Sequence, residues 1–247
     1  MSQSRFSFKE RPEFHVAIVM DGNGRWALRQ GKSRIYGHRA GGPVVRHIVE
    51  AAPDLGISTL TLYAFSSDNW QRPKQEVNLL MQLFMKYLKS EVKDCIKNSV
   101  RLSFIGRRDR IDPALAMAME AAESSTKDGS TIHLRVAIDY SSRDMILKAV
   151  SLLNGQKEIS REDFSQLLAE AQNGGYTSPD VDLLIRTGGE KRLSDFLLWE
   201  CAYAELYFTD IMWPDFNAQH LKTAVAEFHK RDRRFGYVPH AVALLEK

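Results

Sequence analysis

The sequence predicts a single α/β domain built on a six-stranded, mainly parallel sheet flanked by helices. Short β-rich segments recur along the chain with helix-like stretches between them, and this alternation is typical of a parallel sheet covered on both faces. The chain has 247 residues and contains neither a repeat nor a linker long enough to divide it. We therefore expect residues 1–14 to form a flexible N-terminal segment and residues 15–247 to form one domain.

The expected strands are runs rich in β-branched, aliphatic and aromatic residues, which favour a pleated and half-buried surface. In order they are HVAIVM (15–20), TLTLYAF (59–65), RLSFIG (101–106), HLRVAI (133–138), LLIRT (183–187) and ELYF (205–208). Helical patterns occupy the intervals, at residues 38–52, 76–97, 112–126, 142–153, 161–172 and 217–231.

The second expected helix is apolar on more than one face. Its main stripe runs at spacings of three and four residues through Val77, Leu80, Met81, Phe84, Leu88 and Val92. A second apolar row contains Leu79, Leu83 and Tyr87, with Met85 beside it. One interpretation is a helix buried between the sheet and a neighbouring helix. The other is that one row lines a cavity for an apolar ligand.

Composition and cysteine content limit the class of protein. No apolar run approaches the roughly 20 residues that span a bilayer, and the N-terminal segment lacks the apolar stretch of a signal peptide. The two cysteines, Cys95 and Cys201, have neither a CxxC partner nor a nearby histidine pair, so neither a disulfide framework nor a zinc site is indicated. We expect a cytoplasmic protein.

Positive charge is concentrated near the start of the chain. Residues 1–48 contain nine Lys and Arg residues but three acidic ones, although the whole chain carries a net charge of only +3. Such an excess suits nucleic acid, an anionic membrane surface or a phosphorylated ligand. The basic residues alternate with a glycine-rich loop, and no nucleic-acid-binding signature is present, so nucleic acid is not an expected partner.

The loop MDGNGRW (20–26), directly after the first expected strand, predicts a phosphate site. Gly22 and Gly24 let the backbone approach an anion closely, and Arg25 adds a fixed positive charge. Asp21 would repel phosphate directly, so a carboxylate here suits a magnesium ion that bridges it to a diphosphate. The alternative is a glycine-rich turn capped by Asp21.

Two further loops follow the second and fifth strands. They are SSDNWQRP (66–73), which carries Arg72, and RTGGEKRLS (186–194), which carries Arg186, Arg192 and Ser194 around two glycines. Ligands of parallel sheets bind beyond the C-terminal ends of the strands, where all three loops lie. Each loop alone is compatible with a solvated turn. Beside an apolar helix, the three together indicate a ligand with charged heads and an apolar tail.

Two phosphate chemistries are disfavoured. The tripeptide GKS (31–33) looks like the end of a P-loop, but Trp26 stands where that motif requires its first glycine. A phosphatase with Asp21 as nucleophile would usually carry a second acid two residues later, where this chain has Asn23.

Several motifs closely resemble the cis-prenyltransferases, the family of bacterial undecaprenyl diphosphate synthase. They are HVAIVMDGNGRWA, GHRAG, TLTLYAFSSDNWQRPKQEV, LLIRTGGEKRLSDFLLW and AYAELYFTDIMWPDF, and the similarity runs from His15 to Gly236. The resemblance implies a single α/β domain, a six-stranded mainly parallel sheet, a hydrophobic tunnel, a homodimer and Mg²⁺ as cofactor.

The resemblance also implies the site residues. Asp21 would position magnesium and the diphosphates, Asn69 would accept a proton in concert with Ser66, and Glu205 would be a second magnesium ligand near the dimer interface. Residues implied to bind the allylic and isopentenyl diphosphates are Gly22, Asn23, Gly24, Arg25, Trp26, Arg34, His38, Ser66, Ser67, Asp68, Trp70, Arg72, Arg186, Arg192 and Ser194. Arg234 and Gly236 resemble a C-terminal motif that reaches toward a neighbouring subunit.

The implied reaction condenses isopentenyl diphosphate units onto an allylic diphosphate, farnesyl diphosphate, and makes undecaprenyl diphosphate as a lipid carrier for cell-wall glycan synthesis. Peripheral contact with the inner face of the membrane would serve product release. One alternative is a synthase of a short cis-prenyl diphosphate in a specialised pathway. Another is a non-catalytic partner subunit, although such subunits lose the residues that correspond to Asp21, Asn69 and Glu205. Ala64, Leu79, Leu83 and Met85 suggest a medium chain length.

The sequence departs from the family pattern at two places. The usual Asn-Tyr-Gly-Gly-Arg stretch after the fourth strand is Asp139 to Arg143, with serines at both glycine positions. The usual Gly-Asp after the third strand is Gly106-Arg107. The two changes have opposite signs, and one hypothesis is that they offset each other electrostatically. Because they spare the diphosphate loops, we expect activity to be retained.

Overall fold

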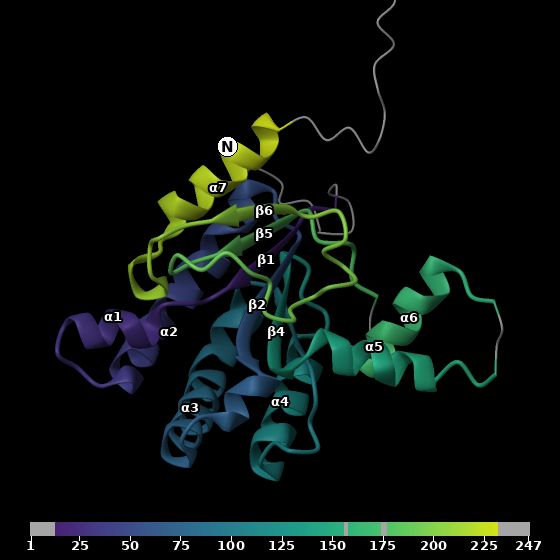
Figure 1. Ribbon diagram of the computed structural model, residues 1–247, viewed down its shortest axis with the longest axis horizontal. Helices are drawn as coiled ribbons and strands as arrows, with labels where there is room; N and C mark the ends of the chain where they lie inside the picture. The colour runs from purple at the N-terminus through teal and green to yellow at the C-terminus, as the bar shows by residue number, and fades with distance from the viewer. Residues whose placement is uncertain (1–12, 156–157, 174–176, 232–247) are drawn as a thin grey trace, which may run out of the picture.

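A computed structural model describes residues 13–155, 158–173 and 177–231. Its sheet contains six strands in the order β3-β4-β2-β1-β5-β6, and every neighbouring pair is parallel. The strands are β1 (His15–Val19), β2 (Thr59–Ser66), β3 (Val100–Ile105), β4 (Ile132–Tyr140), β5 (Leu183–Arg186) and β6 (Glu205–Phe208). The predicted fold class and all six predicted strands are confirmed (Figure 1).

Six of the α-helices in the described residues correspond to the predicted helical stretches. They are α2 (Arg34–Ala51), α3 (Lys74–Lys97), α4 (Pro113–Thr126), α5 (Ser142–Ser151), α6 (Arg161–Ala171) and α7 (Ala218–Lys230). The short helix α1 (Asn23–Arg29) was not among them. Two short 3-10 helices are also present, η3 (Ser67–Gln71) and η4 (Trp213–Asp215). The sequence predicted a loop at η3.

Side-chain caps set the start of several helices. Asp112 accepts a hydrogen bond from the backbone of Ala114 before α4, and Ser160 accepts one from Asp163 before α6. Asn217 caps α7 in the same way, through the backbone of Gln219 and His220. Each cap satisfies a backbone N–H that has no partner within its helix.

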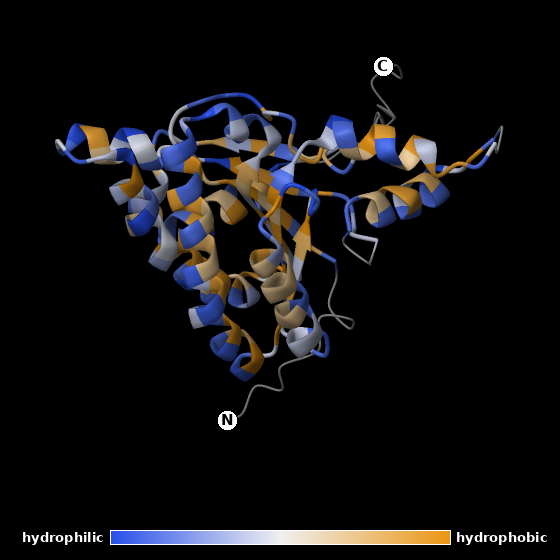
Figure 2. Ribbon diagram, turned by 90° about the horizontal axis from the view of Figure 1, so that it is seen from below, coloured by the Kyte–Doolittle hydropathy of each residue, from blue (hydrophilic) through white to orange (hydrophobic). Residues whose placement is uncertain are grey.

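The sheet separates two hydrophobic cores. One lies between the sheet and helices α2, α3, α4 and α7, and it includes Ile18, Leu62 and Trp213. The other lies on the opposite face under α5, α6 and the segment 193–204, and it includes Tyr63 and Phe196. Figure 2 shows the strands largely in the hydrophobic colours and the helices striped, as burial of one helix face requires.

The strand order determines where the loops meet. The chain moves from β1 to β2 on one side, whereas β5 pairs with β1 on the other. Val19, the last residue of β1, is in register with Tyr63 of β2 and with Arg186 of β5. Loops that leave β1, β2 and β5 therefore emerge side by side at a topological switch point, where parallel sheets bind ligands.

The ends of the chain lie mostly outside the described residues. The described residues do not include residues 1–12 of the expected N-terminal segment, nor Arg234 and Gly236 of the C-terminal motif. Phe14 is buried, and its ring packs on Phe228 of α7 at 5.0 Å between centroids. Among the described residues, no helix combines the length and the apolar character that crossing a bilayer requires.

Candidate active site

A cavity of about 410 Å³ opens at the C-terminal edge of β1, β2 and β5. It gathers most of the predicted site residues from four separate parts of the chain. Those that line it are Asp21, Gly22, Asn23, Gly24, Arg34, His38, Ser66, Asp68, Asn69, Arg72, Arg186, Arg192 and Ser194. Topology alone brings these residues together, because they lie up to 173 positions apart in the chain.

Asp21 is held as a carboxylate at this cavity. Oδ1 accepts from the backbone N–H of Gly22 at 2.6 Å and lies 3.2 Å from Arg25, and Oδ2 accepts from Arg186 at 2.9 Å. Burial acts to raise the pKa of Asp21, but the Arg186 hydrogen bond, the Gly22 N–H and Arg25 outweigh it and lower that pKa. The group is therefore ionised at neutral pH and half-buried.

The two glycines of the first loop have different roles. Gly22 has φ +101°, and a Cβ there would lie 2.9 Å from Cβ of Met212. A Cβ on Gly24 would lie 2.7 Å from the guanidinium carbon of Arg34. Gly22 thus lets the chain turn from β1 into α1, and Gly24 leaves the space in which the Arg34 guanidinium sits.

Arg186 organises the loop after β5. It is buried at the end of the strand, and Nη1 donates to the backbone oxygen of Arg192 at 2.5 Å and to Oγ of Ser194 at 2.8 Å. Nη2 reaches Asp21 at 2.9 Å. One guanidinium therefore connects the first and third predicted loops, a task that suits its planar set of donors.

Ser66 and Asn69 hold each other at the end of β2. Oδ1 of Asn69 accepts from the backbone N–H of Ser66 at 3.2 Å, and the Ser66 side chain accepts from the Asn69 backbone. This reciprocal capping box begins η3 and places both side chains at the cavity.

His38 of α2 is neutral in this cavity. Burial, with the positive charge of Arg72, lowers its pKa to about 4. Nε2 is buried and has no hydrogen-bond partner among the described residues. A buried polar atom without a partner costs free energy, and a ligand oxygen or a water in the cavity would satisfy it.

Two glutamates that sequence analysis missed neutralise the arginines. Glu76 at the start of α3 lies 3.6 Å from Arg34 and 3.3 Å from Arg72. Glu190, in the glycine-rich loop after β5, pairs with Arg192 at 2.5 Å and with Arg25 at 3.3 Å. Their only signal in the sequence is proximity to the predicted loops, which does not distinguish them from solvated acids.

Five predicted site residues lie outside the cavity lining. Trp26 faces the other side of α1, where Nε1 donates to Asp215 at 2.8 Å and the ring stacks on Tyr36. Ser67 and Trp70, on η3, are likewise absent from the lining. Glu205 and Arg25 are the other two, and Arg25 reaches the site through its contacts with Asp21 and Glu190.

Glu205 is not close to Asp21 within one chain. It begins β6 and is in register with Leu183, whereas the C-terminal edge of β5 is Arg186. Three strand residues correspond to about 10 Å. Glu205 instead pairs with Arg231 at 2.6 Å. Among the described residues, moreover, no three His, Cys, Asp or Glu side chains are grouped to hold a metal.

The hydrogen bond to Asp109 raises the pKa of Arg107, and the charge of Asp139 adds to that rise, so the predicted attraction between Arg107 and Asp139 is present, although Asp139 is not the main partner of Arg107. The Arg107 guanidinium pairs with Asp109 at 2.6 Å, although its backbone N–H donates to the backbone oxygen of Asp139. The fully buried Asp139 carboxylate is paired with Arg110, whose Nε donates to Oδ2 at 2.9 Å. Arg107 and Arg110, three positions apart in an irregular loop, point to different partners, which spacing along the chain does not reveal.

A second, apolar cavity of about 360 Å³ continues from the first between the sheet and helices α2, α3 and α4. Both are lined by Met20, Val45, Ala64, Phe84 and Tyr87. Phe84, Leu88 and Val92 of the predicted apolar stripe line it, so the cavity interpretation of α3 is confirmed for that stretch. Leu79 and Met85 do not line it, and Leu83 lines only the first cavity.

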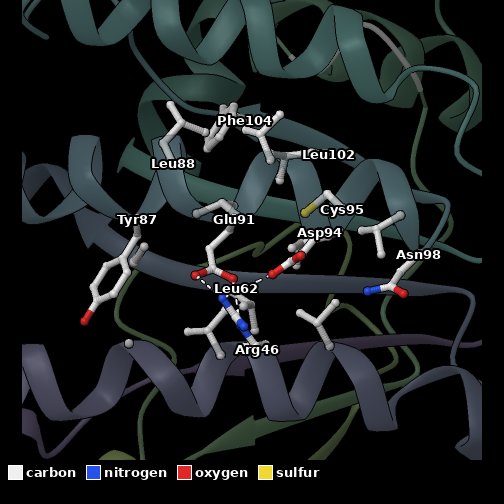
Figure 3. A pocket seen from close by; sticks show the side chains of 18 of the residues that line it. Arg46, Leu62, Tyr87, Leu88, Glu91, Asp94, Cys95, Asn98, Leu102 and Phe104 are labelled. Atoms are coloured by element: carbon white, nitrogen blue, oxygen red, sulfur yellow. Dashed lines mark hydrogen bonds and ion pairs between the residues drawn. The ribbon is translucent and has the colours of Figure 1, made fainter.

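The outer rim of the apolar cavity is charged. In Figure 3, Glu91 and Asp94 of α3 point toward Arg46 of α2, and Leu62 of β2 lies behind them. Arg46 donates to both oxygens of Glu91 at 2.8 and 2.9 Å and lies 3.3 Å from Asp94. The inner surface beyond this ion pair is apolar, with Leu88, Leu102 and Phe104.

Comparison with known proteins supplies the family. Residues 19–236 match the model of the family described as "Putative undecaprenyl diphosphate synthase". This match covers most of the chain and includes the loops that build the charged cavity. The chain belongs to the undecaprenyl diphosphate synthase family.

Relatives within this family cover nearly the whole chain. Isoprenyl transferase 1 of Bradyrhizobium diazoefficiens is 58% identical over 224 residues, which are 91% of this chain and 89% of the relative. The farnesyl-diphosphate-specific ditrans,polycis-undecaprenyl-diphosphate synthase of Aliivibrio fischeri is 46% identical and matches 90% of this chain and 88% of its own. A similar solved structure is that of lavandulyl diphosphate synthase from Lavandula x intermedia, in complex with dimethylallyl diphosphate. It superposes with a TM-score of 0.85 and 34% sequence identity, and the match covers 90% of this chain and 98% of the other.

Proposed function

We propose that this prenyltransferase condenses isopentenyl diphosphate with an allylic diphosphate, farnesyl diphosphate, and makes undecaprenyl diphosphate, the lipid carrier for cell-wall glycans. The observation that carries the proposal is the joining of two unlike cavities. A charged cavity lined by Arg34, Arg72, Arg186 and Arg192 opens directly into an apolar one. That pair of surfaces fits a substrate with a diphosphate head and a hydrocarbon tail.

The charged cavity suits the departure of a diphosphate. Breaking the allylic C–O bond leaves its electron pair and a growing negative charge on the leaving oxygen. Arg34 and Arg72 would stabilise that charge from fixed positions, since Glu76 already holds both guanidinium groups. Neutral His38 would donate or accept a hydrogen bond there without adding charge. Before substrate binds, Glu76 and Glu190 balance part of the positive charge of the arginines.

The second substrate would sit against the loop after β5. Arg192 and Ser194 would hold its diphosphate, and Arg186 positions both through its own hydrogen bonds. Its double bond then attacks the allylic carbon, and proximity of the two bound substrates supplies much of the rate. A proton leaves the condensed product, and Asn69, held by Ser66, is our candidate to accept or relay it.

The residues fit Mg²⁺ bound through substrate. Mg²⁺ usually takes one or two carboxylates together with substrate phosphates rather than an all-protein cage. Asp21 supplies one ionised, half-exposed carboxylate at the cavity, and the described residues hold no larger acidic cluster. When bound, the ion would neutralise diphosphate charge. Asp21 would hold and orient it, with Arg25 and Arg186 setting the position of the carboxylate.

The apolar cavity would receive the tail as it grows. Each buried CH₂ contributes about 0.8 kcal/mol, so elongation is favoured as long as the cavity can take the tail. Glu205 would reach a second active site only in a homodimer, because within its own chain it lies away from Asp21. Release of so apolar a product would require peripheral contact with the inner face of the membrane, with the enzyme cytoplasmic.

Mass spectrometry of the reaction product tests the proposal directly. The purified protein would be incubated with Mg²⁺, farnesyl diphosphate and isopentenyl diphosphate, with a matched reaction in EDTA. We expect undecaprenyl diphosphate in the first reaction and no prenyl product in the second. Absence of any condensation product with either farnesyl or geranyl diphosphate would refute the proposed activity.

A short-chain synthase is the second candidate. The structural similarity to a lavandulyl diphosphate synthase shows that this fold also occurs in an enzyme named for a short prenyl product. The length of the apolar cavity favours the longer product, since it runs from Ala64 to Asn98 and Val100 at the far ends of α3 and β3. A product with only one or two added units would support the short-chain candidate.

A further inference from the structure

The back of η3 is held by an ion pair that the proposed reaction does not use. Asp139, at the end of β4, is fully buried and adopts φ +50°. Arg110, in the loop before α4, pairs with both of its carboxylate oxygens. The Arg110 side chain is partly exposed, so the pair bridges the surface and the interior.

The same two side chains contact η3. Oγ of Ser67 donates to Oδ1 of Asp139 at 3.3 Å. The Arg110 guanidinium lies over the Trp70 ring, 5.8 Å from its centroid, and Phe65 packs edge-on against the same ring at 5.3 Å. Two of the five residues of η3 are thus fixed from behind.

Asn69 lies between these two anchors and faces the opposite way. It lines the charged cavity, whereas Ser67 and Trp70 do not. A 3-10 helix has about three residues per turn, so Ser67 and Trp70, three positions apart, lie on one face, while Asp68 and Asn69 face the cavity. The predicted roles of Ser67 and Trp70 as substrate contacts are therefore better explained as anchorage of the short helix that carries Asn69.

We propose that Arg110 and Asp139 are positioning residues for prenyl transfer, acting through Ser67 and Trp70 to hold Asn69 against the substrates. This inference rests on the proposed function. The ion pair has an energetic reason to act as a unit, because a buried carboxylate that loses its cation is strongly destabilised. Loss of Arg110 would release Trp70 and leave Asp139 unpaired beneath Ser67.

The first test compares two arginines of the same loop. Arg110→Gln removes the cation from Asp139, whereas Arg107→Gln removes one that pairs with exposed Asp109. We expect Arg110→Gln to lower kcat roughly 10- to 100-fold, as small displacements of reacting groups do. The KM for the allylic diphosphate should rise by a smaller factor than kcat falls, because Asp21 and Arg34 hold that diphosphate from other elements and only Arg72 directly follows η3. Arg107→Gln should behave as wild type.

Rescue distinguishes positioning from general damage. Asn tolerates positive φ, and its side-chain oxygen can still accept a hydrogen bond from Ser67. Asp139→Asn should therefore lower kcat only a few-fold, because one charge-assisted contact is lost. In the double variant Arg110→Gln/Asp139→Asn no buried charge is left unpaired, and most of the lost kcat should return. If Arg110→Gln does not fold, Arg110→Lys, which keeps the charge without the paired donors, should show an intermediate loss.

Hydrogen exchange gives a readout that is independent of activity. Peptides that cover residues 66–71 should exchange faster in Arg110→Gln than in Arg107→Gln and wild type. Equal exchange and equal kcat in the two arginine variants would overturn the proposal. If wild type made no prenyl product, the proposed function would fall, while the exchange comparison would still decide whether the pair holds η3.

Discussion

At the scale of single residues, Asp21 is fixed more tightly than a surface carboxylate would be. A backbone N–H and two guanidinium groups contact its two oxygens, and together they keep it ionised. These contacts fix the orientation of the carboxylate, and a metal ligand needs a fixed orientation as much as it needs negative charge. Removing the negative charge should therefore affect catalysis far more than folding.

Asp21→Asn tests this residue. We expect kcat to fall at least about 100-fold, comparable with loss of one group that stabilises transition-state charge. The thermal unfolding midpoint should fall only modestly, because Asp21 pairs with the buried Arg186 but is itself partly exposed. Isopentenyl diphosphate incorporation over a Mg²⁺ titration gives the measurement, and Asp128→Asn on an exposed turn is the control. Turnover equal to wild type would contradict the assignment.

Gly24→Ala tests the space beside Arg34. The added Cβ would lie 2.7 Å from the guanidinium carbon, so the flexible end of Arg34 must move away. We expect the KM for the allylic diphosphate to rise roughly tenfold, the loss of one charge-assisted hydrogen bond. A double-mutant cycle with Arg34→Ala checks the cause. Additive effects of the two changes would show that Gly24 does not act through Arg34.

At the scale of elements, α3 serves both cavities. Its first turn supplies Glu76 to the arginines, its middle supplies Phe84 to both cavities, and its second half supplies Leu88 and Val92 to the apolar one. Ala64 faces it from β2 at the junction. A helix with two rows of apolar side chains can pack into the core and line a cavity at the same time.

Ala64→Leu should narrow the junction between the two cavities. The larger side chain would occupy volume that the tail needs, and overpacking in a filled site costs typically 1–3 kcal/mol. We expect shorter products, with the first condensation still proceeding. Mass spectrometry of the product distribution measures this, and Ala226→Leu on the exposed face of α7 is the matched control. An unchanged distribution would show that the tail takes another route.

At the scale of the whole molecule, the sheet carries buried histidine as well as its apolar core. His15 is fully buried in β1, where its ring nitrogens contact Thr61 at 2.8 Å and the backbone oxygen of Pro179 at 2.9 Å. Burial, with the nearby charge of Arg135, lowers its pKa to about 3. The unfolded chain takes up this proton near pH 6.5.

The protein should therefore lose stability in acid. Below pH 6.5 the unfolded state binds a proton at His15 that the folded state does not, so the free energy of unfolding falls as pH falls toward 3. The slope for one such group is at most about 1.4 kcal/mol per pH unit. Urea unfolding between pH 7 and pH 4 measures it. In the His15→Gln variant, unfolding should take up about one proton fewer, and the pH dependence should weaken accordingly. An unchanged pH dependence would assign the effect to other groups.

The sequence by itself determined the strands, most of the helices and the chemistry of the loops. Apolar runs such as residues 15–19 predict buried strands because periodicity and side-chain shape act locally. The order of strands and helices then predicts a parallel sheet whose loops meet at one edge. Asp21, the two glycines after it, and Arg186 could be proposed as a site on that basis.

Only the tertiary structure decided which side chains face each other. Glu76 and Glu190 pair with the arginines, Asp139 pairs with Arg110 rather than Arg107, and Glu205 lies at the opposite end of its strand from the cavity. Each of these contacts depends on the direction in which a side chain leaves a short or irregular segment. Such directions are set by packing against elements distant in sequence, and local patterns do not encode them.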